Sequence, residues 1–292
     1  MNLFLVEVRR CLSRRLVWVL LMIAAVAIVV TGVLVFANTA RTQPGEQVLT
    51  SVCEVEVVTP GQPPVEECRT EPGVVKPFTL TDLWPVGGGD PALAASVFFL
   101  AIGGLLGGAS MIGAEWRAGT MATVLTWEPR RVRLAVAKLA AATVLAWVFA
   151  MALQVLLVLA VVPAAAAHGS TEGVDGEWLR VLAGGVFRSG AMAAFAALVG
   201  GAVAMIGRNT AAAFGAAFAY MVIGENLVRA WKPWLRPWLL AENAVIFLTG
   251  RPLNDPLVMR QFGTAAMTLL AYCVALAAVA VASLRLRDVA SS

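Results

Sequence analysis

Long uncharged apolar stretches alternate with short polar segments along this chain of 292 residues. A helix needs about 20 residues to cross roughly 30 Å of hydrocarbon, and most of the stretches reach that length. They predict six transmembrane helices, at residues 16–37, 92–113, 134–165, 179–206, 210–227 and 261–284. The expected fold class is therefore an all-α polytopic membrane protein.

The segments between these spans differ in character. Residues 1–15 form two opposite helical faces, one apolar and one charged: Leu5, Val8 and Leu12 against Glu7, Arg10 and Arg14. This pattern is typical of a helix in the membrane interface, and the alternative is a basic segment that only precedes the first span. The others are a polar segment at 38–91, a basic loop at 114–133, a proline-rich, re-entrant or interfacial segment at 229–260 and a tail at 285–292.

Composition excludes several classes of protein, and the distribution of charge predicts which side of the membrane each segment lies on. The chain is 60% apolar and only 14% charged, which excludes an ordinary cytosolic enzyme, a disordered protein and a nucleic-acid-binding protein. With the N-terminus inside, 12 of the 22 Lys and Arg residues fall on short cytoplasmic segments. We expect a multi-pass protein of the plasma membrane with both termini cytoplasmic and residues 38–91 outside.

The inventory of reactive side chains is small. The chain has one histidine, His168, and its four cysteines form no C-x-x-C pair, which argues against a metal or redox site. No G-x-x-x-x-G-K-[ST] string occurs, so any use of ATP must come from another subunit. We expect no catalytic residue, no metal and no cofactor bound by this chain.

Two cysteines fall in the segment expected to lie outside, where thiols are not kept reduced. Cys53 and Cys68 are 15 positions apart, with prolines and a glycine between them to turn the chain back. They predict a disulfide, and closing a loop of that size contributes about 3 kcal/mol in the chain-entropy model. Cys11 and Cys273 lie in inner or membrane regions and should stay reduced.

Few polar side chains interrupt the spans. Arg188 lies inside the fourth span, where it snorkels outward, pairs with a neighbouring span or binds an anionic headgroup. Glu225 lies near the outer end of the fifth span and is expected to pair with Arg229. The second span carries two G-x-x-x-G registers that favour close helix packing: Gly103 with Gly107, and Gly104 with Gly108.

The loop at 114–133 combines charge with turn signals. Glu115 is expected to start a short amphipathic piece, Gly119 and Thr120 to break it, and Pro129 to start a new element. Lys138, in the first turns of the next span, can snorkel to the headgroups. Such a loop suits contact with a partner protein, and the alternative is a solvated basic loop.

The order Glu115, Gly119-Thr120, Leu125, Pro129 and Arg131, followed by a lysine in the next helix, resembles the permease subunits of ABC-2-type (type V) ABC transporters. The layout of an N-terminal elbow helix, six spans and an outer amphipathic segment before the last span is also similar. The arginine stands one residue earlier than in commoner members, so Arg130, Arg131 or Arg133 could fill its role.

This resemblance implies an exporter subunit that moves an amphipathic substrate, such as a drug, lipid or peptide, outward. The implied partners are two ABC ATPase subunits, which bind the ATP and Mg, a second permease copy or homologue, and membrane lipids. The implied ATPase-coupling residues are Glu115, Arg117, Gly119, Thr120, Pro129 and Arg131, with a second contact in the elbow helix around Glu7, Arg10 and Arg14.

Two other classes compete with this interpretation. An intramembrane enzyme needs clustered Asp, His or Ser groups at one membrane depth, and no span carries paired aspartates. A membrane scaffold or immunity protein that transports nothing has the same outline, and only ATP-dependent flux separates it from an exporter.

Overall fold

The computed structural model describes residues 3–41, 47–56, 65–74, 78–86, 91–253 and 258–286 of the protein. Within this part of the chain, six helices are long and apolar enough to cross a membrane, which confirms the predicted number of spans. The architecture is therefore that of a multi-pass membrane protein.

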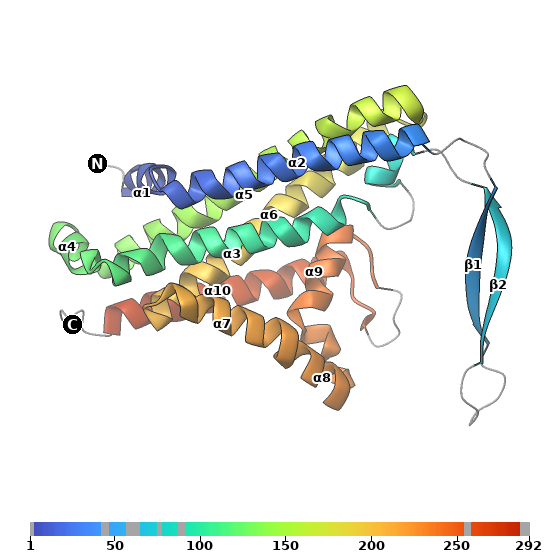
Figure 1. Ribbon diagram of the computed structural model, residues 1–292. Helices are drawn as coiled ribbons and strands as arrows, with labels where there is room; N and C mark the ends of the chain where they lie inside the picture. Colours follow the sequence, from blue (N-terminus) through green and yellow to red (C-terminus); the bar gives the residue numbers. More distant parts are fainter. Residues whose placement is uncertain are drawn as a thin grey trace.

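The six candidate spans lie side by side in one bundle (Figure 1). They are α2 (Arg15–Arg41), α3 (Ala94–Arg117), α5 (Arg131–His168), α6 (Gly176–Gly207), the composite helix Thr210–Trp231 and α10 (Phe262–Leu286). A short N-terminal helix, α1 (Leu3–Leu12), a second short helix, α4 (Thr120–Trp127), and the last turn of α10 lie at the same end of the bundle. We call this the terminal end and the opposite one the far end.

The pair α3 and α6 forms the tightest part of the bundle, because glycines bring the two backbones together. A Cβ added at Gly104 or at Gly108 would overlap the carbonyl oxygen of Ala193 or Ala197 on α6. Gly103 and Gly107 have nothing within 4 Å. One of the two predicted glycine registers is therefore used inside this chain, and the other faces outward.

The fifth span is interrupted and then turns back. It consists of α7 (Thr210–Phe218), the π-helix η2 (Ala219–Gly224) and α8 (Glu225–Trp231). Proline-rich residues then form the 3-10 helix η3 (Pro233–Trp238), because proline cannot continue an α-helix. The chain returns toward the bundle as α9 (Leu240–Thr249) before the last span begins.

The segment predicted at 38–91 contains a hairpin, which is the departure from an all-α chain. Strands β1 (Gln47–Glu56) and β2 (Val65–Val74) pair antiparallel. The register places Cys53 directly opposite Cys68. The cysteines whose side chains are described, Cys11 and Cys273, are free, so the disulfide itself stays a prediction. The 3-10 helix η1 (Leu80–Leu83) follows the hairpin and packs on the far end of α5.

Candidate functional site: a buried ion cluster

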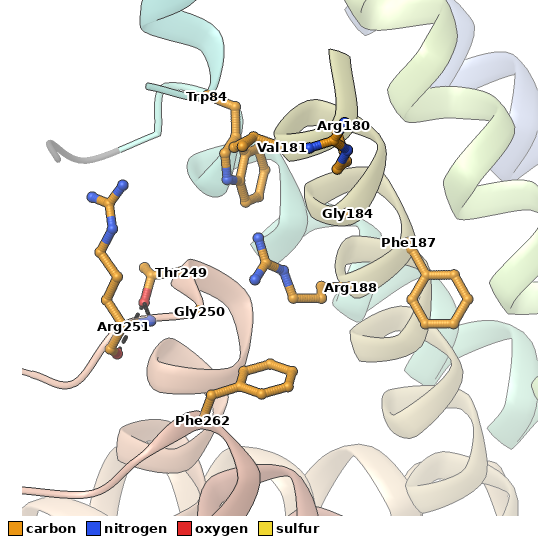
Figure 2. Close-up of a pocket in the computed structure, with 10 residues that line it drawn as sticks. All are labelled: Trp84, Arg180, Val181, Gly184, Phe187, Arg188, Thr249, Gly250, Arg251 and Phe262. Atoms are coloured by element: carbon orange, nitrogen blue, oxygen red, sulfur yellow. Dashed lines mark hydrogen bonds between the residues drawn. The ribbon is translucent and has the colours of Figure 1, made fainter. Parts of the chain in front are cut away.

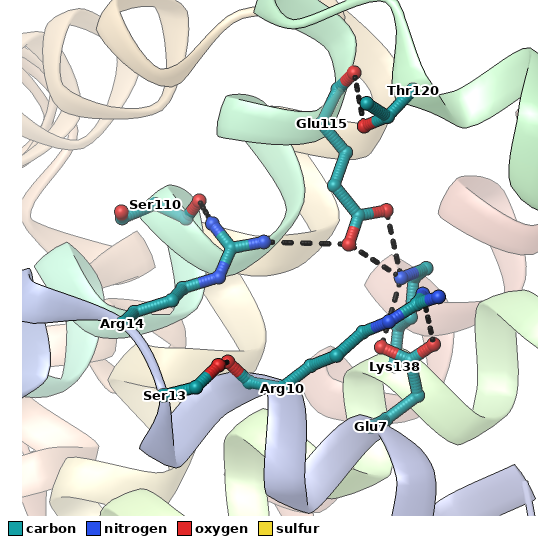
Figure 3. A network of polar contacts seen from close by, with 8 residues as sticks. All are labelled: Glu7, Arg10, Ser13, Arg14, Ser110, Glu115, Thr120 and Lys138. Atoms are coloured by element: carbon teal, nitrogen blue, oxygen red, sulfur yellow. Dashed lines mark hydrogen bonds and ion pairs between the residues drawn. The ribbon is translucent and has the colours of Figure 1, made fainter.

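A fully buried lysine joins three helices at the terminal end. Lys138 lies two turns into α5, and none of its side chain is exposed. Its Nζ atom donates to Oε2 of Glu7 on α1 at 2.9 Å and to Oε1 of Glu115 on α3 at 2.9 Å (Figure 3). The second Glu115 oxygen, Oε2, lies 2.8 Å from Nζ as an ion-pair contact. Both carboxylates are themselves buried, so the three charged groups are neutralised mainly by one another and not by solvent.

Two arginines complete the cluster toward its edge. Arg10 Nη1 lies 3.2 Å from Glu7 Oε1, and Arg14 Nη2 lies 3.3 Å from Glu115 Oε1. Arg14 also donates from Nη1 to the carbonyl oxygen of Ser110 at 3.0 Å. Each buried carboxylate therefore faces both Lys138 and one arginine. A buried ion that loses its partner is strongly destabilising, by about 3–5 kcal/mol, so these contacts hold α1, α3 and α5 in one arrangement.

One residue of the charged face of α1, Glu7, points into the bundle. Leu5, expected on the apolar face, is 57% exposed, whereas Glu7 and Cys11 face the bundle. The reason is Lys138, whose ammonium group needs a carboxylate inside the protein. Burial on this face raises the pKa of the Cys11 thiol, and the nearby Arg14 partly offsets the rise.

Two expectations for the neighbouring residues are corrected. Lys138 does not snorkel to the headgroups, because its ammonium group is enclosed by the two carboxylates. Glu115 does not start a separate amphipathic piece but belongs to the last turn of α3, and it is only 6% exposed. Its carboxylate points inward, toward the Lys138 ammonium group.

The exposed element at this end is α4, which the sequence did not separate from the loop around it. Gly119, with φ of 65°, ends the run of α3 and lets the chain restart at Thr120. Buried Met121 anchors α4 in the core, whereas Trp127 at its last position is 86% exposed. The break at Gly119 is as predicted.

The coupling residues proposed from the resemblance thus separate into two groups. Glu115 belongs to the ion cluster, and Thr120 begins α4, donating from Oγ1 to the Glu115 carbonyl at 3.4 Å. Arg117, Gly119 and Pro129 are exposed between the helices or beside them, and Arg131 is the half-buried first residue of α5. Only the first group is brought together with the elbow residues Glu7, Arg10 and Arg14.

The turn between the fourth and fifth spans lies beside α4. Arg208 adopts a left-handed conformation, φ 53°, and its guanidinium Cζ stands 4.8 Å from the centre of the Trp116 ring on α3. Asn209 caps α7 by accepting from the Ala211 amide at 2.9 Å. This turn gives α3 a further contact at the terminal end, through Trp116.

A second polar network fixes the returning segment. Oε1 of Glu225 accepts from the Ala241 amide at 3.0 Å, and Oε2 lies 3.5 Å from Arg229 Nη2, which confirms the expected pair. Arg229 and Arg236 both reach Oε1 of Glu242, at 3.2 and 3.3 Å. The sequence did not indicate Glu242 as a partner, because its position follows from the reversal of the chain at η3.

Arg188 lies elsewhere, in a pocket between α6, the end of α9 and the start of α10 (Figure 2). It shares this pocket with two other arginines and with aromatic rings, and it has no described carboxylate partner. Among the residues that the structure describes, no group of three or more His, Cys, Asp or Glu side chains is placed to hold a metal ion. No protein-family model and no curated protein matches the chain.

Proposed function

We propose that this chain is the permease subunit of an ATP-binding cassette exporter. It moves an amphipathic substrate outward, using ATP that a separate subunit hydrolyses. The observation that carries the proposal is the position of α4, a short exposed helix joined to α3 and α5 beside the Lys138 cluster. The resemblance of residues 115–138 to ABC-2 permeases points the same way.

The ion cluster supplies a physical route for coupling. A partner that pushes on α4 moves the ends of α3 and α5 through the connections at Gly119 and Pro129. Because Lys138 binds both Glu7 and Glu115, separating any of the three helices strands a buried charge. The helices α1, α3 and α5 therefore move together, and the chain transmits force while making and breaking no covalent bond.

The proposed topology follows from the charge distribution. The terminal end, with α1 and α4, faces the cytoplasm of a cell whose plasma membrane holds the protein. The hairpin of β1 and β2 lies outside, where Cys53 and Cys68 form a disulfide. Directly opposite residues in an antiparallel hairpin have Cα atoms about 4.5 to 5.5 Å apart, whether or not the pair is hydrogen-bonded. A disulfide spans this separation, and the register pairs Cys53 with Cys68.

The proposed assembly has two permeases and two ATPases. Each ATPase docks on α4 and binds the ATP and Mg. The second permease, a copy or a homologue, meets this one within the membrane. Gly103 and Gly107, on the outward face of α3, and the largely exposed helix α2 offer small and apolar surface for that contact.

The test pairs the protein with an ABC ATPase encoded by a neighbouring gene. The two proteins are coexpressed, and copurification and substrate-stimulated ATPase activity are measured. Trp127→Ala combined with Arg117→Glu should lower that stimulation about tenfold, as loss of an interface hot spot does. Trp231→Ala, an exposed tryptophan at the far end, is the matched control and should leave it unchanged.

Two results would contradict the proposal. One is full coupling in the Trp127 and Arg117 variant, and the other is equal loss in the Trp231 control. A protein that binds the ATPase but supports no ATP-dependent flux in vesicles would be a scaffold and not an exporter. Charge reversal at Glu115 is unsuitable here, because it breaks the buried cluster and perturbs folding.

A further inference from the structure

The pocket around Arg188 is lined by cations and rings. It has a volume of about 470 Å³ and opens between Trp84, after η1, and Phe262, the first residue of α10. Arg180, Arg188 and Arg251 line it, and none of its described lining residues is acidic. Like charges within one pocket repel, so an anion between them lowers the electrostatic free energy.

The walls are shaped around the Arg188 side chain. Gly250, in a left-handed turn with φ of 74°, sits against the guanidinium group, and a Cβ there would overlap Nη1 of Arg188. Gly185 in turn makes room for the Trp84 ring, which a Cβ would also overlap. Because neither glycine has a Cβ atom, the Arg188 guanidinium group can lie against Gly250 and the Trp84 ring against Gly185.

The guanidinium group is held between two rings and lacks one hydrogen bond. Its Cζ lies 5.7 Å from the centre of the Trp84 ring and 6.0 Å from that of Phe262. The Nε atom is buried and has no hydrogen-bond acceptor among the described residues. A charged residue inside a membrane span is costly and is kept when it has a functional partner. The described residues therefore leave this Nε atom without an acceptor.

The depth of the pocket indicates what that partner is. Phe262 begins the last span, so the pocket lies at the level where the hydrocarbon of that span starts. The exposed ring of Phe187 continues the lining toward the lipid side. Phosphate groups of lipids occur at this level, and the planar fork of arginine matches a phosphate with two parallel hydrogen bonds.

We propose that the Arg188 pocket binds the phosphate oxyanion of an anionic amphiphile, with Arg188 and Arg180 on the phosphate and Phe187 and Phe262 beside the apolar part. The lipid headgroup and a soluble phosphate ester share this oxyanion chemistry. The membrane level of the pocket and its aromatic rim favour the lipid. Binding of a phosphate at this site does not require an ATPase at the terminal end.

The test measures lipid retention by the full-length protein. It is purified in detergent, exchanged into mixed phosphatidylglycerol and phosphatidylcholine, and examined by native mass spectrometry for bound lipid. The wild type should retain phosphatidylglycerol in preference to phosphatidylcholine. Arg188→Gln should reduce that preference about tenfold, since hydrogen bonds to charged groups contribute the most. Lys232→Gln, a cation at the far end outside the pocket, should leave the preference unchanged.

A second variant keeps the test decisive if Arg188→Gln folds poorly. Arg180 is exposed on α6, so Arg180→Gln should fold normally and reduce the preference about threefold. Glycerol phosphate at the same concentration should not displace the lipid. Displacement by glycerol phosphate overturns the assignment to a lipid. Equal retention of both lipids by the wild type, or an unchanged preference in both arginine variants, overturns the site.

Discussion

Lys138 and Arg188 are both cations among apolar helices, one at each end of the bundle, and their surroundings differ. Lys138 is enclosed by two carboxylates of its own chain, at distances of 2.8 to 2.9 Å. Arg188 faces two other arginines and two aromatic rings, with no described carboxylate. The first charge is paired within the chain and holds helices together, whereas the second has no described counter-ion and is the one we propose to bind a ligand. The presence of a counter-ion within the chain thus distinguishes a charge that stabilises the fold from one that we expect to bind a ligand.

The largest expected effect tests the internal compensation. Lys138→Met leaves Glu7 and Glu115 buried without their cation, so the free energy of unfolding should fall by about 3–5 kcal/mol. Thermal unfolding in detergent measures the loss. The control is the triple variant Lys138→Met, Glu7→Leu and Glu115→Leu, which removes every stranded charge and should recover most of the stability. If the single variant is as stable as the wild type, the cluster holds nothing together.

The hairpin tests which end of the bundle lies outside. A Cys53–Cys68 disulfide should appear as a linked peptide pair in non-reduced, alkylated protein, because the register places the two residues opposite each other. Reducing it should remove about 3 kcal/mol of hairpin stability in the chain-entropy model, measured by proteolysis near residue 60. If both thiols are alkylated in protein purified without a reducing agent, no disulfide has formed, and the hairpin would then lie on the cytoplasmic side.

The docking of α1 can be followed by a thiol within it. Cys11 is 7% exposed, and burial raises its pKa, so at pH 7.5 it carries less thiolate than a free cysteine and reacts slowly. Lys138→Met should release α1 and speed maleimide labelling of Cys11 about tenfold, in a background with the other three cysteines changed to serine. The rate should also rise with pH toward the raised pKa. Equal rates in both proteins would show that α1 does not depend on Lys138.

The smallest expected effect lies at Arg188. In delipidated protein, Arg188→Gln removes one of three like charges, and no described carboxylate loses a partner, so the free energy of unfolding should change by less than about 0.5 kcal/mol or rise slightly. The same thermal assay compares it with Lys138→Met. A loss as large as that of Lys138→Met would mean that Arg188 is compensated within the chain after all.

Local sequence patterns predicted the spans and the break at Gly119, because the length of an apolar run and the position of a glycine can both be read from one continuous stretch of sequence. They did not predict the cluster, since Glu7 and Lys138 are 131 positions apart. One signal was available. A lysine in an apolar helix needs a carboxylate, and the segments expected to lie in the cytoplasm offer few acidic residues beyond Glu7 and Glu115.

The pocket around Arg188 could not be predicted from the sequence for a different reason. Arg188 was visible as a charge in a span, but three explanations remained open: snorkelling outward, pairing with a neighbouring span and binding an anionic headgroup. Gly250 and Arg251 reach it only because the prolines of η3 turn the chain back into α9. Such a reversal depends on how the segment packs, and the polar network around Glu225 and Glu242 that fixes it forms only in the folded protein.

The length of α5 connects the two ends. Its 38 residues form a rod of about 57 Å, with Lys138 near one tip and His168 at the other. Beyond that tip, Ser170 pairs with Thr79, and Val161 and Ala165 pack in the cluster that contains Trp84. A tilt of about 5° at the terminal end sweeps the far tip through roughly 5 Å over a rod of this length. In the proposed exporter, a short stroke at α4 would therefore become a larger displacement of the wall behind Arg188.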